Sequence, residues 1–290
     1  MTAIGSALVV GGDGVIGGAL RTALLAQGWR VVVTSRRPSI DPDIRRIDLA
    51  SPPAQWEALG EHDIAFLCAG ITKLSACEDD PAGSSLVNVA HLSVLAERLA
   101  AGGCRLLYPS TNLVLGGGLP FMPSDAPYRP VSEYGRQKAL AEQRLLRLGE
   151  RAAILRMTKI VPPRPPLFRQ WEEALRAGRT VQPLSDLVMS PIALDDLIDA
   201  MILVATQGGG GIYQVSGDRD MSYAEAAMLL ADRLGCSRRL VQPKTMAELG
   251  VAAAAAMPHT TLDITRVAEE FSLGLFDAAA TVNGIDLDEQ

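Results

Sequence analysis

The chain has 290 residues, which is enough for one large domain or two smaller ones. Hydrophobic residues make up 48% and charged residues 21%, an ordinary balance for a globular protein. The formal net charge is -6, which argues against nonspecific nucleic-acid binding because such binding depends on an excess of positive charge.

The four cysteines and three histidines are scattered along the chain. They form no C-x-x-C pair and no metal-ligand spacing, so we expect reduced cysteines and no metal site. The N-terminal residues lack the basic start and long apolar run of a signal peptide, and no apolar stretch is long enough to span a bilayer. These features predict a cytoplasmic protein with no membrane partner. The alanine run at 252–256 is expected to be helical.

Strand and helix patterns alternate along the first half of the chain. Short apolar or β-branched runs predict strands, and apolar residues at helical spacing predict helices. The predicted strands are 7–10, 30–35, 44–49, 64–70, 104–111 and 152–157. The predicted helices are 18–28, 85–103 and 132–149. This alternation indicates an α/β fold built on a Rossmann-like, doubly wound parallel sheet.

The pattern changes after about residue 160, where PPRPP (162–166) breaks regular structure. The segments that follow do not repeat the strand–helix rhythm. Helices are expected at 168–178, 194–208 and 222–235, and a strand at 211–217. We therefore predict an NAD(P)-binding Rossmann domain over 1–160 and a smaller, mixed α/β substrate-binding lobe over 161–290. Some segments of this lobe can return to the edge of the sheet.

A glycine-rich loop, GGDGVIGG (11–18), joins the first predicted strand to the first predicted helix. Gly11, Gly14 and Gly17 give the spacing G-x-x-G-x-x-G. Glycine permits a tight turn and a close approach of the backbone to a pyrophosphate, which the first N–H groups of the helix then face. A plain glycine-rich turn is the alternative, but the strand–turn–helix context favours a dinucleotide site.

The second predicted strand ends in Ser35, Arg36 and Arg37. Sites that prefer NAD usually place an acidic residue there, whereas two guanidinium groups suit the 2′-phosphate of NADP. We therefore expect NADP, with NAD possible and a solvated basic loop as the alternative interpretation. Further candidate cofactor contacts follow the third and fourth strands: Asp48, Leu49, Cys68, Ala69 and Gly70.

The helix predicted at 132–149 carries Tyr134 and Lys138, four residues apart and therefore on one face. A nearby ammonium is expected to lower the pKa of a tyrosine and to hold a nicotinamide ribose. Thr111, at the end of the fifth predicted strand, offers a hydroxyl to the same reacting oxygen. Each feature alone is more often a solvated surface or a turn. Their order along the chain favours a proton donor, its activator and an oxygen-binding hydroxyl.

These motifs resemble the extended short-chain dehydrogenases/reductases, in the NAD-dependent epimerase/dehydratase group, and most of all the dTDP-4-dehydrorhamnose reductase-like proteins. STNLVLGG (110–117) is similar to the motif S-T-D-x-V-F-x-G, and YGRQKALAE (134–142) to Y-G-x-x-K-x-x-x-E. Weaker similarity continues through 190–205, 211–235 and 259–271. The resemblance covers nearly the whole chain.

The resemblance implies roles for individual residues. The catalytic set is Thr111, Tyr134 and Lys138, and substrate contacts are Thr111, Asn112 and Tyr134. The implied cofactor contacts are Gly11, Asp13, Gly14, Val15, Ile16, Gly17, Arg36, Arg37, Ala69, Gly70, Tyr134, Lys138 and Thr158. Asn88 is implied to be structural. Asn112 replaces the family's Asp, and Lys73 departs from its usual pattern, so the identity of the sugar stays open.

Three functions remain in view. The first is an NADP(H)-dependent reduction of a carbonyl, on a nucleotide-activated 4-keto sugar, with Tyr134 as proton donor. The second is a sugar-nucleotide epimerase that retains NAD, and the third is a non-catalytic protein that senses a dinucleotide. Other candidate substrate contacts are Lys73, Arg164, Arg169 and Gln214, although single cations are more often solvated. The long helices at 85–103 and 132–149 allow a homodimer.

Overall fold

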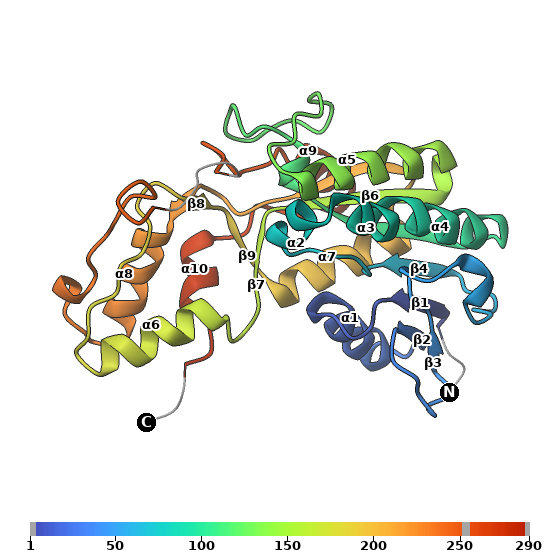
Figure 1. Ribbon diagram of the computed structural model, residues 1–290, viewed down its shortest axis with the longest axis horizontal. Coiled ribbons are helices and arrows are strands. Elements are labelled where there is room, and N and C mark those ends of the chain that lie inside the picture. The colour runs from blue at the N-terminus through green and yellow to red at the C-terminus, as the bar shows by residue number, and fades with distance from the viewer. Residues whose placement is uncertain (1–3, 251–255, 288–290) are drawn as a thin grey trace. The chain divides into compact units, whose positions relative to one another are not determined.

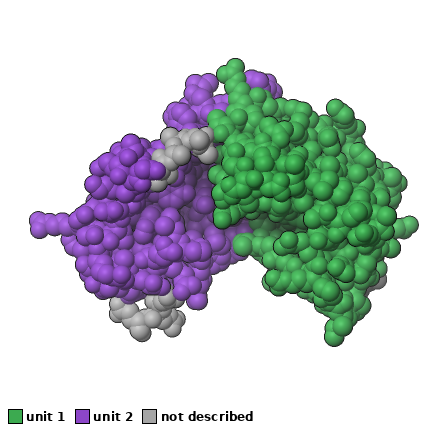
Figure 2. Space-filling model, viewed as in Figure 1, with its two compact units in different colours: residues 1–114, 128–156, 198–213 green, residues 115–127, 157–197, 214–290 purple. Residues whose placement is uncertain are grey.

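The computed structural model describes residues 4–250 and 256–287. The chain divides into two compact units, each made of three segments (Figure 2). Unit 1 comprises Met1–Val114, Tyr128–Arg156 and Ile198–Tyr213. Unit 2 comprises Leu115–Pro127, Met157–Leu197 and Gln214–Gln290. The cofactor and substrate domains predicted at 1–160 and 161–290 stay a prediction, because compactness assigns no function to either unit.

A seven-stranded sheet runs in the order β10-β6-β5-β4-β1-β2-β3. Its strands are β1(Ser6–Val10), β2(Arg30–Ser35), β3(Ile44–Arg46), β4(Ile64–Leu67), β5(Arg105–Thr111), β6(Ala152–Met157) and β10(Gly211–Val215). The pairs β1–β2, β1–β4, β2–β3 and β4–β5 are parallel. The predicted Rossmann-like sheet is confirmed. Successive strands extend the sheet first on one side of β1 and then on the other, so the switch point lies between β1 and β4.

Helices of unit 1 lie on both faces of this sheet. Figure 1 shows α1(Val15–Ala26) on one face, and α4(Leu92–Ala101) and α5(Glu133–Leu145) on the other. Alternate strand residues such as Leu8 and Val10 share a core cluster with Leu95 and Leu99 of α4. The period of two along the strand and of three to four along the helix brings these side chains to one interface.

The helix predicted at 85–103 is present but begins earlier and is not uniform. It consists of α3(Pro81–Ser85), a π-helical turn η2(Leu86–His91) and α4. In the turn, the Asn88 amide donates to the Ile71 carbonyl oxygen at 2.9 Å and to Gln137 Oε1 at 2.8 Å. Asn88 Oδ1 accepts the Ile71 N–H at 2.7 Å, so the π turn fastens the segment after β4.

Unit 2 contains two small two-stranded sheets. β7(Lys159–Val161) pairs in parallel with β9(Pro191–Ala193), and β8(Val188–Met189) pairs antiparallel with β11(Met221–Ser222). Its helices α6(Pro166–Arg176), α8(Tyr223–Arg233) and α10(Ala278–Asn283) share an apolar core that includes Trp171 and Leu230. The helices predicted at 168–178 and 222–235 are therefore confirmed.

The remaining elements are short or divided between the units. They are η1(Pro53–Gln55), α2(Leu74–Asp79), η3(Asn112–Val114), η4(Leu146–Arg151), α7(Leu194–Gln207), η5(Arg238–Leu240) and α9(Thr265–Phe271). Residues 252–255 of the alanine run lie outside the described residues. The four cysteines are free thiols. Within residues 4–250 and 256–287, no helix has the length and apolar character needed to cross a bilayer.

Candidate functional site

The glycine-rich loop follows β1 at the switch point of the sheet. Gly11 has φ +91°, and a Cβ there would lie 2.8 Å from the backbone of Ala69. A Cβ on Gly17 would lie 2.2 Å from the Gly11 carbonyl oxygen. Both positions therefore require glycine for the fold itself, because no side chain fits between these backbone segments.

Gly14 is different, because the fold leaves room for a side chain there. A Cβ on Gly14 would meet only the Gly11 carbonyl oxygen, at an ordinary 3.5 Å. Gly14 is the N-cap of α1 and gives it no side-chain cap, and the first turn, which begins with Val15 and Ile16, holds no acidic residue. The first N–H groups of α1 thus present positive potential beside open space, which fits a dinucleotide phosphate.

The end of β2 is tied to this loop. Ser35 Oγ donates to the Asp13 carboxylate at 2.7 Å and accepts the Arg37 backbone N–H at 2.9 Å. The side chains of Arg36 and Arg37 are exposed, whereas Ser35 is buried. Ser35 therefore fixes the two loops against each other, and the two residues that follow it along the chain, Arg36 and Arg37, carry exposed guanidinium groups.

The other predicted cofactor contacts follow β3 and β4. Asp48 Oδ1 accepts the Ala50 N–H, and Leu49 is buried, so both shape the turn after β3. The backbone of Ala69 packs against Gly11. Gly70 lies against Asn88, because a Cβ added to Gly70 would be 3.0 Å from Asn88 Oδ1. Burial raises the pKa of the Cys68 thiol to about 12.

Tyr134 and Lys138 lie on α5, whose first turn is capped by Ser132 Oγ accepting the Gly135 N–H at 3.1 Å. The Lys138 ammonium donates to the Pro109 carbonyl oxygen at 2.7 Å. It lies 4.0 Å from the centroid of the Tyr108 ring and 5.9 Å from that of the Tyr134 ring. The helix and the end of β5 are thus joined directly at the predicted catalytic residues.

Thr111 closes β5 and is partly exposed. Its Oγ1 accepts the Leu113 N–H at 3.2 Å and donates to Asn112 Oδ1 at 3.3 Å, which places Asn112 beside it. A Cβ on Gly135 would lie 2.3 Å from the Leu113 carbonyl oxygen, so α5 packs backbone to backbone against this segment. Unit 1 therefore brings Thr111, Tyr134 and Lys138 to one edge of the sheet.

The expectation that Lys138 lowers the pKa of Tyr134 is wrong for this structure. Burial raises the pKa of the Tyr134 hydroxyl instead. Burial also lowers the pKa of Lys138 to about 8, against the opposing effect of the Glu142 carboxylate and the Cys68 thiol. Desolvation determines the direction of both pKa shifts, and the Lys138 ammonium binds the Pro109 carbonyl oxygen and lies almost 6 Å from the Tyr134 ring centroid.

Several predicted residues belong to unit 2 or to the surface. Thr158 is buried, and its hydroxyl has no hydrogen-bond partner among the described residues. Gln214 is buried and donates to the backbone carbonyls of Met122 and Asp263, a structural role. Arg164 and Arg169 form long, exposed ion pairs at 3.9 Å. Lys73 is an exposed residue at the start of α2.

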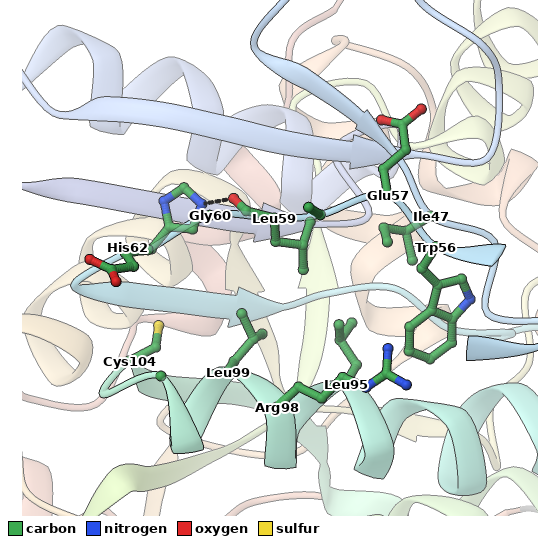
Figure 3. A pocket seen from close by; sticks show the side chains of 13 residues that line it. Ile47, Trp56, Glu57, Leu59, Gly60, His62, Leu95, Arg98, Leu99 and Cys104 are labelled. Carbon is green, nitrogen blue, oxygen red and sulfur yellow. Dashed lines mark hydrogen bonds between the residues drawn. The ribbon is translucent and has the colours of Figure 1, made fainter. Parts of the chain in front are cut away.

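A separate apolar pocket of about 310 Å³ lies in unit 1, between residues 56–62 and α4 (Figure 3). Its lining includes Trp56, Leu59 and Leu95, and none of the predicted site residues. His62 donates from Nε2 to the Leu59 carbonyl oxygen, and its Nδ1 is shielded from solvent. Exposed charged residues also line this pocket, namely Glu57, Glu61 and Arg98.

The chain is similar to known proteins over most of its length. The family model described as RmlD substrate binding domain matches residues 5–282. A dTDP-4-dehydrorhamnose reductase of Mycobacterium tuberculosis (strain ATCC 25618 / H37Rv) is 26% identical over 241 residues, covering 80% of this chain and 78% of that protein.

Solved structures share the fold at low sequence identity. A dTDP-4-dehydrorhamnose reductase from Bacillus anthracis str. Ames, in complex with NADP, has a TM-score of 0.82 and 18% identity, covering 96% of this chain and 97% of its own. MoeE5, in complex with UDP-glucuronic acid and NAD, has a TM-score of 0.80 and 24% identity, covering 97% and 98%. With its Rossmann-like sheet and the match over residues 5–282, the chain belongs to the RmlD substrate binding domain family, with the fold of the extended short-chain dehydrogenases/reductases.

Proposed function

We propose that the protein is an NADP(H)-dependent reductase that acts on the carbonyl of a nucleotide-activated 4-keto sugar. One observation carries the proposal: Thr111 at the end of β5 meets the α5 segment that bears Tyr134 and Lys138, through the Lys138–Pro109 hydrogen bond and the close approach at Gly135. Membership of the family and the name of the Mycobacterium tuberculosis relative support the substrate class.

Each residue of the candidate site has a separate role in the proposed carbonyl reduction. A reduced nicotinamide, when bound, supplies the hydride. Tyr134 donates a proton to the carbonyl oxygen as negative charge develops on it, and Thr111 Oγ1 holds that oxygen in place. The Tyr134 hydroxyl is protonated at neutral pH, as a general acid must be, although the burial that raises its pKa also makes it a weaker acid. Lys138 holds the nicotinamide ribose and offsets the developing charge.

The dinucleotide is placed by residues of unit 1. The open space at Gly14 and the uncapped start of α1 suit the pyrophosphate, and the exposed Arg36 and Arg37 suit a 2′-phosphate. Asp13 is bound by Ser35 Oγ, and the residues after Ser35 are the two arginines, so the positive charge there favours NADP. Thr158, whose buried hydroxyl lacks a partner among the described residues, is proposed to contact the nicotinamide.

The decisive experiment follows NADPH oxidation with a panel of 4-keto sugar nucleotides, comparing wild type with Tyr134→Phe. We expect turnover by wild type and a loss of about 10²–10⁴-fold in kcat for Tyr134→Phe, because the general acid is removed. Tyr223→Phe, another tyrosine whose pKa burial raises, is the matched control and should keep its activity.

Three outcomes would replace the proposal. Full activity of Tyr134→Phe would remove Tyr134 from the chemistry. NAD that stays bound through purification, together with interconversion of sugar epimers and no net oxidation of NADPH, would identify an epimerase. Binding of a dinucleotide without turnover of any carbonyl substrate would instead favour a non-catalytic sensor.

A further inference from the structure

We propose that Glu142, paired with Arg156, is a positioning residue that fixes the catalytic end of β5 against α5 and supplies the negative charge that Lys138 faces. The inference rests on the proposed function, because it assigns a purpose to the geometry of Thr111 and Lys138. In the sequence, Glu142 ends the YGRQKALAE segment that is similar to Y-G-x-x-K-x-x-x-E, but that similarity gives it no positioning role.

The carboxylate is fully buried and fully bonded. The side chain of Glu142 is 0% exposed and that of Arg156 is 1% exposed. Arg156 Nη2 donates to Glu142 Oε2 at 2.8 Å, and Arg156 Nε donates to both carboxylate oxygens at 3.1 and 3.2 Å. The Tyr128 hydroxyl donates to Oε2 at 2.9 Å, and Ser110 Oγ donates to Oε1.

Such a pair is a poor choice for stability alone. Removing two charges from water costs several kcal/mol for each ion, and apolar residues of similar volume often stabilise a protein as well or better. A buried, fully bonded pair instead confers a defined geometry. Glu142 lies on α5, Ser110 on β5 and Arg156 on β6, so the carboxylate ties three elements together at one point.

The ties converge on the proposed site. Glu142 follows Lys138 by four residues, so the two side chains leave the same face of α5 on successive turns. Lys138 binds the carbonyl oxygen of Pro109, and Glu142 binds the hydroxyl of Ser110. Two consecutive residues of β5 are thereby held by α5, and the next residue along the strand is Thr111.

The same carboxylate acts on the charge of Lys138. Burial lowers the pKa of Lys138 to about 8, and Glu142 is the main group that opposes this effect, followed by Cys68 after β4. The other groups facing the ammonium are the Tyr108 ring on β5 and the Tyr134 ring on α5. Arg156 pairs with the same carboxylate. Removing the negative charge should therefore lower the pKa of Lys138 further.

The test compares Glu142→Gln with two other variants. Glu142→Gln keeps the shape and removes the charge, and Ser110→Ala removes only the bond to β5. Glu172→Gln is the matched control, because Glu172 is also a buried carboxylate paired with an arginine, Arg176 at 2.9 Å, and it lies in unit 2. Two properties are measured: the pH dependence of kcat for keto-sugar reduction, and the pH dependence of Lys138 labelling by acetic anhydride, read by mass spectrometry.

We expect Glu142→Gln to shift both midpoints downward by about one pH unit. Ser110→Ala should lower kcat about tenfold with little change in KM and no shift of either midpoint, because it disturbs only the position of Thr111. Glu172→Gln should leave both midpoints and kcat unchanged. Should Glu142→Gln fail to fold because Arg156 is left unpaired, the double variant Glu142→Gln/Arg156→Met removes both charges and should shift both midpoints downward by a smaller amount, because the repulsion from Arg156 is removed as well.

A folded Glu142 variant whose labelling midpoint matches wild type would overturn the electrostatic half of the inference. Unchanged kcat in Ser110→Ala would overturn the positional half. The labelling experiment needs no substrate, so its outcome stands even if the wild-type protein reduces no keto-sugar nucleotide. A failure of the proposed function can therefore be told apart from a failure of this inference.

Discussion

Burial acts on both Tyr134 and Lys138, and it shifts their pKa values in opposite directions. Each group resists its charged form in a poorly solvated place, so the pKa of Tyr134 rises and that of Lys138 falls. For a reduction this is a workable arrangement, because the tyrosine must arrive protonated. Lys138 is the group that limits the protonated state at high pH, since with a pKa of about 8 it loses its positive charge in mildly alkaline solution.

This sensitivity predicts the pH dependence of the reaction. Both Tyr134 and Lys138 must be protonated for reduction, and the group with the lower pKa sets the alkaline limit. We expect kcat to be constant at neutral pH and to fall as pH rises through about 8, where Lys138 loses its proton. A pH profile recorded with saturating NADPH and substrate checks this. An alkaline midpoint close to the ordinary pKa of a lysine, about 10.4, would mean that Lys138 is not the limiting group.

At the scale of the element, the glycine-rich loop separates glycines required by the fold from one that the fold does not require. Gly17→Ala places a Cβ 2.2 Å from the Gly11 carbonyl oxygen and should destabilise the protein by about 1–3 kcal/mol. Gly14→Ala meets only an ordinary contact, and Gly14 has φ -80°, which alanine adopts freely. It should therefore fold at least as stably as wild type.

The affinity for the dinucleotide should fall in Gly14→Ala, although the stability of this variant should not. Gly14→Ala should bind NADPH more weakly although its Tm is unchanged or higher, because its methyl group occupies the space left for the phosphates. Thermal unfolding and a fluorescence titration on the same samples separate the two effects. Wild-type affinity in Gly14→Ala would show that no ligand approaches the loop at that residue.

The individual strands and helices show which features the sequence could predict and which it could not. Strand runs such as 30–35 and 152–157 were identifiable because buried parallel strands are continuous apolar stretches. The π turn around Asn88 was not, since its cause is a hydrogen bond to Gln137, 49 residues away. Glu142 lies in a predicted helix and Arg156 in a predicted strand, and no sequence pattern pairs them. Only their pairing in three dimensions reveals that both are buried.

The candidate site was predictable for a different reason. Thr111, Tyr134 and Lys138 come from motifs whose spacing is local, so a single stretch of sequence specifies which residues share an edge or a face. Their pKa values were not predictable, because desolvation depends on residues brought in from other elements. The pKa of Tyr134 is shifted upward, opposite to the expected direction, because desolvation and not Lys138 determines it.

For the whole molecule, a net charge of -6 opposes the approach of a highly charged anion such as NADPH. Local cations must therefore provide the attraction, and Arg36 and Arg37 are the exposed pair at the end of β2. The double variant Arg36→Ala/Arg37→Ala should weaken NADPH binding by about 10–100-fold and leave NADH binding nearly unchanged, because only NADPH carries the 2′-phosphate.

A matched control separates this local effect from total charge. Arg45→Ala/Arg46→Ala on β3 also takes the net charge from -6 to -8, since it removes two positive charges. It should leave the preference for NADPH over NADH intact if the arginines at 36 and 37 act as the phosphate clamp. If both double variants weaken NADPH equally, the whole-molecule field governs binding and the clamp is ruled out. Equal wild-type affinity for NADH and NADPH would also rule out the clamp, because a clamp on the 2′-phosphate must favour NADPH.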